Sequence, residues 1–456
     1  MRSGTSWHNW AGNQAARPAQ VVSPRDVEEV AERVKAAERD GLRVKAIGSG
    51  HSFTAIGLTD GVQVRLGGLS RLLSADRATG LVTVEAGMPL HRLNTLLEDE
   101  GLALSNLGDI DRQTVAGAIS TGTHGTGRAL GGLATQVRQL QLVLGDGSVV
   151  TCSATERPEL FSAARVGLGA LGIVTTVTLQ AEPAFALQAQ ERPMRLPVVL
   201  TELDELVAGN EHFEFFWFPH TDRTLTKCNN RLPDGAPTRP LGRRRAFLED
   251  ELLSNGVFGL SCRMGRLVPA LIPRINAFTG RSLGRRRYAD VSHKVFTSPR
   301  RVRFVEMEYG VPAQAVREAI TGIERVIEQQ RLRVSFPVEV RFTAADDIPL
   351  STASDRASAY LAIHMFKGQP YEKYFREVEA VMKGLDGRPH WGKMHYLDAS
   401  SLRSTYKRFD EFLAVRDRVD PLGRFANPYL DRVLGGVERG QAQVGTPPAC
   451  SKSIEE

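Results

Sequence analysis

Two charged side chains, two positions apart, are the first candidates for chemistry in this sequence. The segment Phe336-Pro337-Val338-Glu339-Val340-Arg341-Phe342 alternates apolar and polar residues, which is typical of a β-strand. A period of two puts Glu339 and Arg341 on one face and the apolar side chains on the other. An acid and a base arranged in this way can orient a polar substrate. The alternative is a solvated strand face, and this pattern taken alone favours that alternative.

Two later segments could contribute to the same site. A strand predicted over 361–366 places Ala362, His364 and Phe366 on one face, which favours a polar pocket shared with the first strand. The run His390-Trp391-Gly392-Lys393 then puts one of only ten lysines in an aromatic, glycine-containing turn. Lys393 is therefore a candidate fixed cation. The alternative is an exposed turn in which the tryptophan is half buried.

Two glycine-rich loops could bind phosphate. Gly48-Ser49-Gly50-His51 ends a predicted strand, and glycines let backbone N–H groups approach a phosphate closely. The loop is not GxGxxG and no helical pattern follows it, so a Rossmann nicotinamide site is not expected. The second loop, Gly117-Ala118-Ile119-Ser120-Thr121-Gly122-Thr123-His124-Gly125, crowds small and hydroxyl side chains together. Each loop alone is explained by a tight turn with an ordinary histidine, but two in one region favour a large phosphate-bearing cofactor.

The elements that must position these residues are of mixed α+β type. Ser23-Pro24 predicts a helix N-terminus and Gly41 its end. Further helices are predicted over 89–100, 312–330 and 371–383. Strands are predicted over 43–47, 62–66, 81–86, 137–144, 148–152, 171–179, 213–218, 302–309, 336–343 and 360–366. Glu182-Pro183 and Arg192-Pro193 suggest a domain boundary near 182–195.

Composition narrows the classes of protein. The 456 residues suggest two or three domains, and the net charge of +6 raises the question of nucleic acid or an acidic membrane as a partner. One stretch, 239–303, holds fifteen Arg or Lys and only four Asp or Glu, and shows no strong periodicity before residue 302. No zinc, helix-turn-helix or RNP pattern supports binding of nucleic acid, so we expect none.

The cysteines and the apolar runs point to a compartment. Cys152, Cys228, Cys262 and Cys450 have no metal-ligand spacing, so no metal is expected and a reducing environment is the simpler interpretation. No apolar run is long enough for a membrane helix and no secretory signal is visible. We therefore expect a cytoplasmic protein, with peripheral membrane association as the alternative; the oligomeric state cannot be predicted.

Taken in order, these segments resemble the aldonolactone oxidase group of vanillyl-alcohol-oxidase-type flavoproteins. That group includes L-gulono-1,4-lactone oxidases and dehydrogenases, D-arabinono-1,4-lactone oxidases and the related alditol oxidases. The resemblance covers residues 10–434 and is most specific at 336–342 and at Gly387-Arg388-Pro389-His390-Trp391-Gly392-Lys393-Met394-His395. It implies an α+β fold with a two-subdomain FAD-binding domain of the PCMH type over 1–182. A cap domain with a large antiparallel sheet flanked by helices would span 183–419, residues 420–435 would return to the first domain, and 436–456 would be a disordered tail.

The resemblance also implies FAD and its contacts. The loop 46–52 would wrap the FAD pyrophosphate, and the histidine matching His51 is often joined covalently to the flavin, so we expect attachment there. Gly108 would lie beside the flavin and leave room for O2. Its neighbour Asp109 replaces a serine that touches FAD and substrate in alditol oxidases. The remaining FAD contacts are expected at Ala46, Ile47, Gly48, Ser49, Gly50, Ser52, Thr114, Gly117, Ala118, Ile119, Ser120, Gly122, His124, Gly125, Ile173 and His390.

The implied reaction is oxidation of L-gulono-, L-galactono- or D-arabinono-1,4-lactone by hydride transfer to flavin N5. O2 or another acceptor would reoxidise the flavin, and an alditol oxidase acting on xylitol or sorbitol is the alternative. Arg341 would steady the developing alkoxide or the lactone carbonyl, Glu339 would fix Arg341, and Lys393 would stabilise the reduced flavin. His364 would be a hydroxyl ligand or base. Substrate contacts are expected at Asp109, Glu339, Arg341, Phe366 and Lys393.

Overall fold

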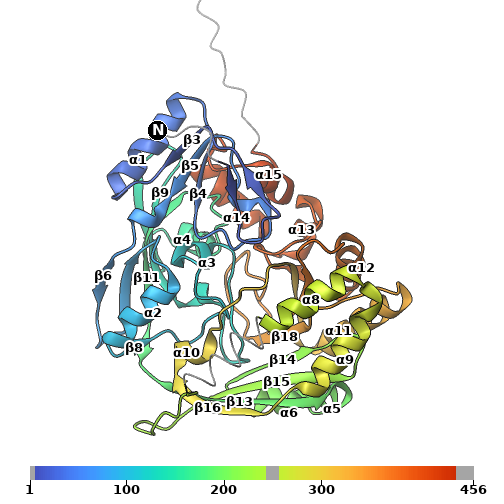
Figure 1. Ribbon diagram of the computed structural model, residues 1–456. Coiled ribbons are helices and arrows are strands. Elements are labelled where there is room, and N and C mark those ends of the chain that lie inside the picture. Colours follow the sequence, from blue (N-terminus) through green and yellow to red (C-terminus); the bar gives the residue numbers. More distant parts are fainter. Residues whose placement is uncertain (1–5, 243–255, 438–456) are drawn as a thin grey trace, which may run out of the picture.

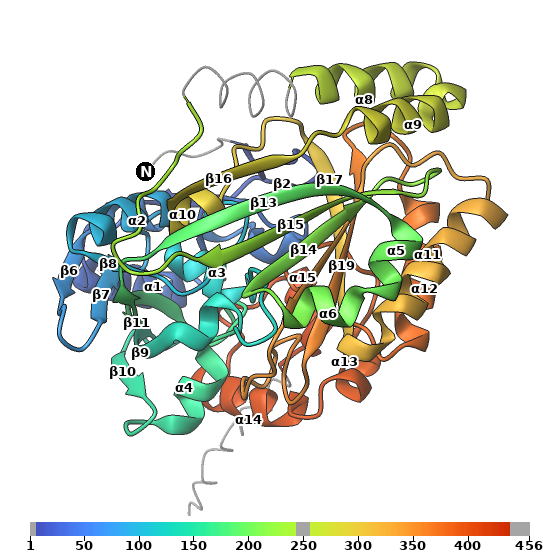
Figure 2. The ribbon, with the colours of Figure 1, turned by 90° about the horizontal axis from the view of Figure 1, so that it is seen from below.

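The computed structural model describes residues 6–242 and 256–437 (Figures 1 and 2). Within them the strands form five sheets, and two cores of buried apolar side chains hold the sheets and helices together. No helix in these ranges is long and apolar enough to cross a membrane. The predicted mixture of helices and sheets is confirmed.

A small parallel sheet lies near the N-terminus, in the order β3 (Gln20–Val22), β5 (Val62–Arg65), β4 (Val44–Ile47). Helix α1 (Val27–Arg39) buries Val30 and Val34, one turn apart, in the first core. The predicted start of this helix at Ser23 is wrong, because the Asp26 carboxylate caps it by accepting the Glu29 N–H at 2.8 Å.

An antiparallel sheet of five strands follows. Its order is β10 (Val149–Ser153), β9 (Val137–Val143), β11 (Ile173–Gln180), β7 (Leu81–Glu85) and β6 (Leu72–Ala75). Helices α2 (Leu90–Asp99), α3 (Val115–Ser120) and α4 (Pro158–Ala164) accompany it. Two short pairs, β1 (Trp7–His8) with β2 (Ala15–Ala16) and β8 (Leu102–Ala103) with β12 (Glu182–Pro183), complete this part.

The short helix α3 was not predicted, although the sequence carries a signal for it. The Thr114 side chain accepts the Gly117 N–H at 3.2 Å, which is a standard N-cap. The glycines and threonines around it obscured the helix. The consequence is that only one side of this segment faces outward from the core.

The largest sheet has eight strands, and each neighbouring pair is antiparallel, as predicted. Its order is β16 (Arg286–Val291), β13 (Ala186–Arg195), β15 (Arg223–Arg231), β14 (His212–Trp217), β18 (Val338–Thr343), β19 (Ser358–Phe366), β17 (Phe304–Pro312) and β20 (Arg388–Pro389). Helices α5 (Leu196–Thr201), α6 (Leu203–Ala208), α11 (Val316–Gln329) and α12 (Glu372–Gly384) lie along one face of it (Figure 2).

Alternation along the central strands gives the two faces of this sheet different chemistry. Val338 and Val340 belong to the second core, together with residues of α11 and α12 such as Ile320 and Phe375. The side chains of Glu339 and Arg341, which alternate with these valines, therefore project from the opposite face. That face lines a cavity that the loops of the N-terminal sheets also line.

The C-terminal segment packs on the first core. Helices α13 (Ala399–Thr405), α14 (Phe409–Val419) and α15 (Pro428–Leu434) contribute buried residues to that core. Leu402 and Phe412 are among them, so the return to this core begins before residue 420. Val44 N–H donates to the Arg424 carbonyl at 2.8 Å, which ties the segment to β4. The expected disordered tail lies outside the described residues from 438 onward.

The basic stretch contains regular elements that the sequence analysis did not predict. Beyond residues 243–255, which lie outside the described ranges, come α8 (Phe258–Leu267), α9 (Ile272–Ser282), β16 and α10 (Ser292–Phe296). The expectation that this stretch lacks periodicity before residue 302 is therefore wrong. Helices α8 and α9 lie together at one margin of the molecule in Figure 2.

Candidate active site

Two adjoining cavities separate the large sheet from the loops of the N-terminal sheets. The first, here called the loop cavity, encloses about 910 Å³ between the loop after β4 and helix α3. The second, the central cavity, encloses about 1040 Å³ and reaches the charged face of the large sheet. His51, Ser52, Gln113 and Thr121 line both cavities, so one bound molecule can extend through the two.

Close backbone packing shapes the loop cavity. A Cβ atom at residue 48 would lie 2.5 Å from Thr114 Oγ1, and one at residue 50 would lie 2.9 Å from the Trp7 ring. Gly50 also has a φ of +72°, which favours glycine. The loop after β4 therefore requires glycine at residue 48 to lie against the start of α3 and at residue 50 to lie against Trp7.

The loop cavity offers donors suited to an anionic group. Within the described residues, the backbone N–H groups of Ser49, Gly50, His51 and Ser52 donate to no protein acceptor. Four consecutive N–H groups without a protein acceptor at a cavity wall can bind an anion such as a phosphate. These residues fit the pyrophosphate of a dinucleotide.

A buried lysine stands beside these donors. Lys45 Nζ donates to the carbonyls of Gly169 and Phe425 at 2.9 and 3.0 Å. Burial lowers the pKa of Lys45 to about 7, although the charges of Asp420 and Asp431 oppose the shift. Lys45 lines the loop cavity, and the sequence analysis did not single it out.

Most of the predicted cofactor residues line the loop cavity, but some do not. Those that line it are Ala46, Ile47, Gly48, Ser49, Gly50, His51, Ser52, Thr114, Gly117 and Ser120. Ala118, Ile119, Gly122, Gly125 and Ile173 line neither cavity. Ala118 and Ile119 face the core from α3, and at the start of β11 the neighbours Gly172 and Val174 line the cavity in place of Ile173.

Gly125 has a packing role instead. A Cβ there would lie 2.3 Å from Asn106 Oδ1 and 2.3 Å from the Leu107 carbonyl oxygen. It therefore keeps two loops in contact behind the cavity wall. Gly108 is less restricted, since its Cβ would lie 3.1 Å from Thr123 Cγ2. Gly108 itself lines the central cavity.

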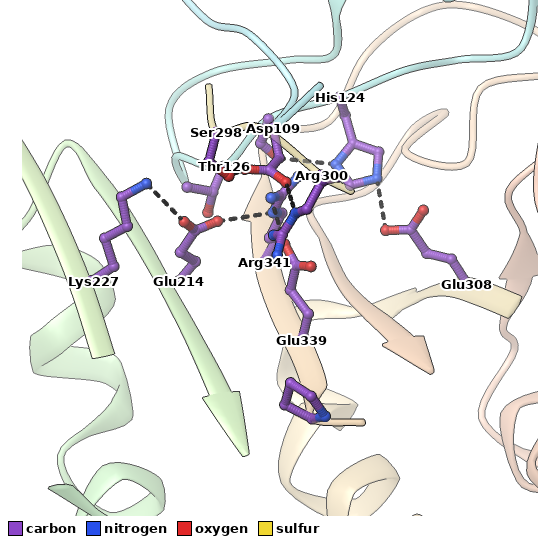
Figure 3. A network of polar contacts seen from close by, with 12 residues as sticks. Asp109, His124, Thr126, Glu214, Lys227, Ser298, Arg300, Glu308, Glu339 and Arg341 are labelled. Atoms are coloured by element: carbon purple, nitrogen blue, oxygen red, sulfur yellow. Dashed lines mark hydrogen bonds and ion pairs between the residues drawn. The ribbon is translucent and has the colours of Figure 1, made fainter. Parts of the chain in front are cut away.

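The predicted pair Glu339–Arg341 exists and belongs to a larger network (Figure 3). Arg341 Nη2 forms an ion pair with Glu339, and Arg341 Nε donates to Glu214 Oε2 at 2.8 Å. Lys227 Nζ lies 3.5 Å from Glu214 Oε1. Burial lowers the pKa of Arg341, but the charges of Glu339 and Glu214 outweigh it and the net shift is upward. Arg341 is thus a cation held from two sides.

Asp109 is tied to the segment before β17. Its two carboxylate oxygens accept the Ser298 hydroxyl at 2.6 Å and the Arg300 Nε–H at 2.7 Å. Burial raises the pKa of Asp109, but the charges of Arg300 and Arg341 outweigh it and bring the value to about 2. Asp109 therefore stays ionised, and both of its oxygens already have protein donors.

Strand β17 contributes two carboxylates that the sequence analysis missed. Glu306 lies 2.5 Å from Lys393 Nζ and 3.5 Å from His364 Nε2, and Glu308 lies 3.2 Å from His124 Nε2. Burial raises the pKa of Glu306, but Lys393 and His364 outweigh it and bring the value to about 2. The run Phe304-Val305-Glu306-Met307-Glu308 alternates like β18, and this signal would have found both residues.

Two buried histidines, His124 and His390, also line the central cavity. His124 Nδ1 lies 2.9 Å from the Gly125 carbonyl, and its ring stacks on Tyr360 with centroids 3.6 Å apart. His390 Nδ1 accepts the Gly392 N–H at 3.1 Å, and burial lowers its pKa to about 4. Ligand-type atoms of His124, Glu308 and His390 lie within 4.8 Å of one another, but the Gly392 N–H occupies one of the nitrogens.

His51 stands where the two cavities meet. Its ring stacks on Trp10 at a centroid distance of 5.8 Å. Burial and the nearby charge of Lys393 lower the pKa of His51 to about 4. A neutral imidazole with an available lone pair therefore lies between the cavities at neutral pH.

Of the two predicted residues at the end of β19, one lines the central cavity. His364 does so, with Nδ1 3.3 Å from the Pro337 carbonyl. Phe366 does not line this cavity. It lies two residues further along β19, where the Arg266 guanidinium is 6.0 Å from the centre of its ring. Phe366 is thus not placed to touch a substrate in the central cavity.

Comparison with known proteins gives a consistent result. Residues 177–433 match the family model described as D-arabinono-1,4-lactone oxidase, and residues 18–153 match an FAD binding domain. The chain is 43% identical to an L-gulono-1,4-lactone dehydrogenase of Mycobacterium tuberculosis, over 94% of this chain and 99% of that protein. It is 36% identical to the L-gulonolactone oxidase of Bos taurus, over 94% and 98% of the two chains. A crystal structure of cholesterol oxidase from B. sterolicum has a TM-score of 0.80 at 17% identity, covering 94% and 97%.

Proposed function

The chain belongs to the D-arabinono-1,4-lactone oxidase family of FAD-dependent oxidoreductases, and from this premise we propose that its substrate is a sugar 1,4-lactone. L-Gulono-, L-galactono- and D-arabinono-1,4-lactone are the candidates. The observation that carries the proposal is the central cavity, where Arg341 and Lys393 are each held by buried carboxylates beside the cavity that fits a dinucleotide.

Arg341 and Lys393 supply the fixed positive charge that the reaction needs. Residues 46–52 would hold FAD, which when bound would supply the hydride acceptor for the reaction. Arg341 would stabilise the substrate oxygen as it loses its proton, because its donors are oriented before the substrate arrives. Glu339 would position Arg341, and Lys393 would balance negative charge that develops on the cofactor side of the cavity. His364 would bind a substrate hydroxyl or accept its proton.

We infer that FAD is joined covalently to His51. The N–H groups of residues 49–52 would hold the pyrophosphate, and His51, one of these residues, lines both cavities. The low pKa of His51 supports this, since only the neutral ring offers a nucleophilic nitrogen. The placement of His124 and His390 in the central cavity makes them candidate contacts of the flavin end.

The domain boundary between 1–182 and 183–419 is also proposed, but the segment that returns to the first core begins at α13 and not at the expected residue 420. The order of strands along the chain supports this boundary, since β11 is the last strand of the five-stranded sheet in the sequence and β13 is the first strand of the eight-stranded one. The second part would then carry Glu339, Arg341 and Lys393, and the first would hold FAD.

The alditol alternative is less well supported. In this chain Asp109 stands where alditol oxidases carry a serine, and its carboxylate is engaged by Arg300 and Ser298. A linear polyol would have to compete with that ion pair for the aspartate. A lactone ring with fewer free hydroxyls avoids that competition.

Anaerobic flavin bleaching separates the candidates. The purified flavoprotein is mixed with each of the three lactones, and with xylitol and sorbitol, and flavin absorbance is followed before O2 is admitted. We expect bleaching by at least one lactone to be much faster than by either polyol. Faster bleaching by xylitol would favour the alditol alternative, and no bleaching by any lactone would overturn the proposal. The rate of recovery after O2 admission distinguishes an oxidase from a dehydrogenase.

A further inference from the structure

Helix α8 turns an apolar stripe toward solvent, although helices of folded proteins usually bury such a stripe. Val257, Leu260, Met264 and Leu267 recur every three or four residues, and their exposed fractions are 47, 55, 46 and 76%. The small residues of the opposite side are buried: Gly259, Cys262 and Gly265. The stripe therefore lies on the outer side of the helix and has no cover within the described residues.

Helix α9 extends this surface. Phe278 is 72% exposed, and Arg274 and Arg281 lie one turn before and one turn after it on the same side. Of the eleven exposed large apolar residues in the described ranges, six fall in 257–278, so the exposure is concentrated at this site. The α8–α9 hairpin, residues 257–282, lies at the margin of the molecule in Figure 2.

The inner side of the hairpin packs on the rest of the molecule, so the position of its outer side is fixed. The buried Asn276 side chain donates to the carbonyls of Pro219 and Val334 at 3.0 and 2.9 Å. At the other helix, Phe258 packs edge-on against Phe336 at 4.8 Å and lines the central cavity. The outer stripe is thus presented by a fixed pair of helices.

The charge around the stripe has a single sign. Residues 256–289 contain no Asp, Glu or Lys, and they contain seven arginines: Arg263, Arg266, Arg274, Arg281, Arg285, Arg286 and Arg287. No described carboxylate forms an ion pair with Arg263, Arg274, Arg281 or Arg285. An apolar stripe bordered by unneutralised guanidinium groups is the pattern of a helix that lies at an anionic lipid surface.

We propose that the α8–α9 hairpin docks this protein on a bilayer containing anionic lipid. The stripe enters the level of the headgroups and acyl boundary, and the arginines contact phosphate groups. A nucleic acid would not need the exposed Leu267 and Phe278. A second copy of the chain would bring arginine against arginine, so self-association at this surface is disfavoured. Docking also places the wall of the central cavity that contains Phe258 beside the membrane.

Co-sedimentation with vesicles tests this proposal on the full-length flavoprotein. Vesicles of phosphatidylcholine with phosphatidylglycerol are compared with vesicles of phosphatidylcholine alone. We expect binding to the anionic vesicles, weaker binding at high salt, and little binding to the neutral ones. Leu267→Glu and Phe278→Glu should each weaken binding by about tenfold or more, since each removes buried apolar area and adds a repelled charge.

Leu422→Glu is the matched control, because Leu422 is an exposed leucine (59%) outside the hairpin. It should bind vesicles like the unmodified protein, and all three variants should keep their lactone turnover in vesicle-free buffer. Absence of binding to anionic vesicles would overturn the proposal, as would equal losses in the hairpin and control variants. A dimer that Leu267→Glu dissociates would also overturn it, in favour of a second copy as the occupant.

Discussion

At the scale of single residues, Arg341 is the side chain whose environment is most completely specified. Glu339 holds one side of its guanidinium and Glu214 the other, the latter at 2.8 Å. Because two carboxylates fix the guanidinium, Arg341 cannot move with a substrate. Its contribution to the reaction is that its donors are oriented before the substrate binds. A lysine cannot satisfy both partners and a substrate oxygen together, because it lacks the planar fork.

Arg341→Lys should therefore lower the rate of flavin reduction by about a hundredfold or more, the usual loss for an oriented donor. Stopped-flow absorbance under anaerobic conditions measures that rate. Arg231→Lys is the control, since Arg231 also bridges two carboxylates, Glu182 and Glu211, but lies outside both cavities. Equal rates in Arg341→Lys and Arg231→Lys would contradict the assigned role.

A second prediction concerns the covalent attachment of FAD to His51. Acid-precipitated protein should keep a yellow, fluorescent flavin, whereas His51→Ala should release all of it. His220→Ala is a suitable control, because burial lowers the pKa of His220 to about 4 as well, but that residue lies away from both cavities. A coloured pellet from His51→Ala would show that another residue holds the flavin.

The next prediction concerns Gly108, which is expected to leave room for O2 beside the flavin. A methyl group there would lie 3.1 Å from Thr123 Cγ2 and 3.2 Å from the His124 carbonyl, so it would fit only by narrowing the cavity at that point. Gly108→Ala should slow reoxidation by O2 and leave the anaerobic reduction by lactone nearly unchanged. Stopped-flow mixing of the reduced enzyme with O2 measures the first rate. Gly67→Ala, where nothing lies within 4 Å of a new Cβ, should change neither.

At the scale of elements, Asn427 connects the C-terminal helix to the loop region after β4. Its Nδ2 donates to the carbonyls of Ala55, Ile56 and Leu58 at 2.8–3.1 Å, and its Oδ1 caps α15 by accepting the Leu430 N–H. One buried side chain thus satisfies four backbone groups in two elements.

Asn427→Ala should lower the free energy of unfolding by about 3 kcal/mol, since it removes a helix cap and the donor to the Ile56 and Leu58 carbonyls. Urea unfolding followed by far-UV circular dichroism measures the change. The control is Asp398→Ala, which removes an exposed cap at α13 and should cost only about 1 kcal/mol. Similar losses in the two variants would mean that the bonds to residues 55–58 contribute nothing.

The sequence analysis predicted elements well where one face of a strand is buried. The strand carrying Glu339 and Arg341 was found because its apolar residues alternate strictly, and the large antiparallel sheet followed from the family resemblance. Glu306 and Glu308 were missed although they alternate in the same way, because no motif drew attention to that strand. Helix α8 was missed although Leu260, Met264 and Leu267 recur at helical spacing, because the neighbouring arginines resemble an unstructured basic stretch.

The prediction of individual contacts was limited by local geometry that the sequence does not display. Whether Ile173 or its neighbours face the cavity depends on the phase of β11, and one residue of difference reverses the answer. The same holds for α3, where Gly117 and Ser120 line the cavity but Ala118 does not. Two residues on one face of a strand need not line the same cavity. Phe366 lies on the same face of β19 as His364, but only His364 lines the central cavity.

At the scale of the whole molecule, charge is separated into two regions of different character. The net charge of +6 depends on the arginines of one stretch, and much of that stretch forms the α8–α9 hairpin. The central cavity, in contrast, is nearly balanced. Its network has five carboxylates and four permanent cations: Asp109, Glu214, Glu306, Glu308 and Glu339 with Lys227, Arg300, Arg341 and Lys393. A balanced cavity suits an uncharged substrate such as a lactone better than a sugar acid.

The buried histidines give the whole molecule a predictable response to acid. Burial lowers the pKa of His220 and His390 to about 4 and that of His395 to about 3, from an ordinary value of 6.5. Between pH 6.5 and about 4 the unfolded chain therefore binds protons at these sites that the folded chain does not. Stability must fall as the pH is lowered through that window.

Two carboxylates of the central cavity do not add to this loss above pH 5, and Glu339 and Asp420, whose pKa burial raises, oppose it. Asp109 and Glu306 have pKa values of about 2, below their ordinary values of 3.8 and 4.5, so their contribution to stability declines only at more acidic pH. The midpoint of thermal unfolding should consequently decrease from pH 7 to pH 5. His395→Gln should reduce the slope of this decrease, because His395 is buried with Nδ1 lacking a protein partner. A midpoint that stays constant or rises toward pH 5 would contradict the assignment of neutral buried histidines.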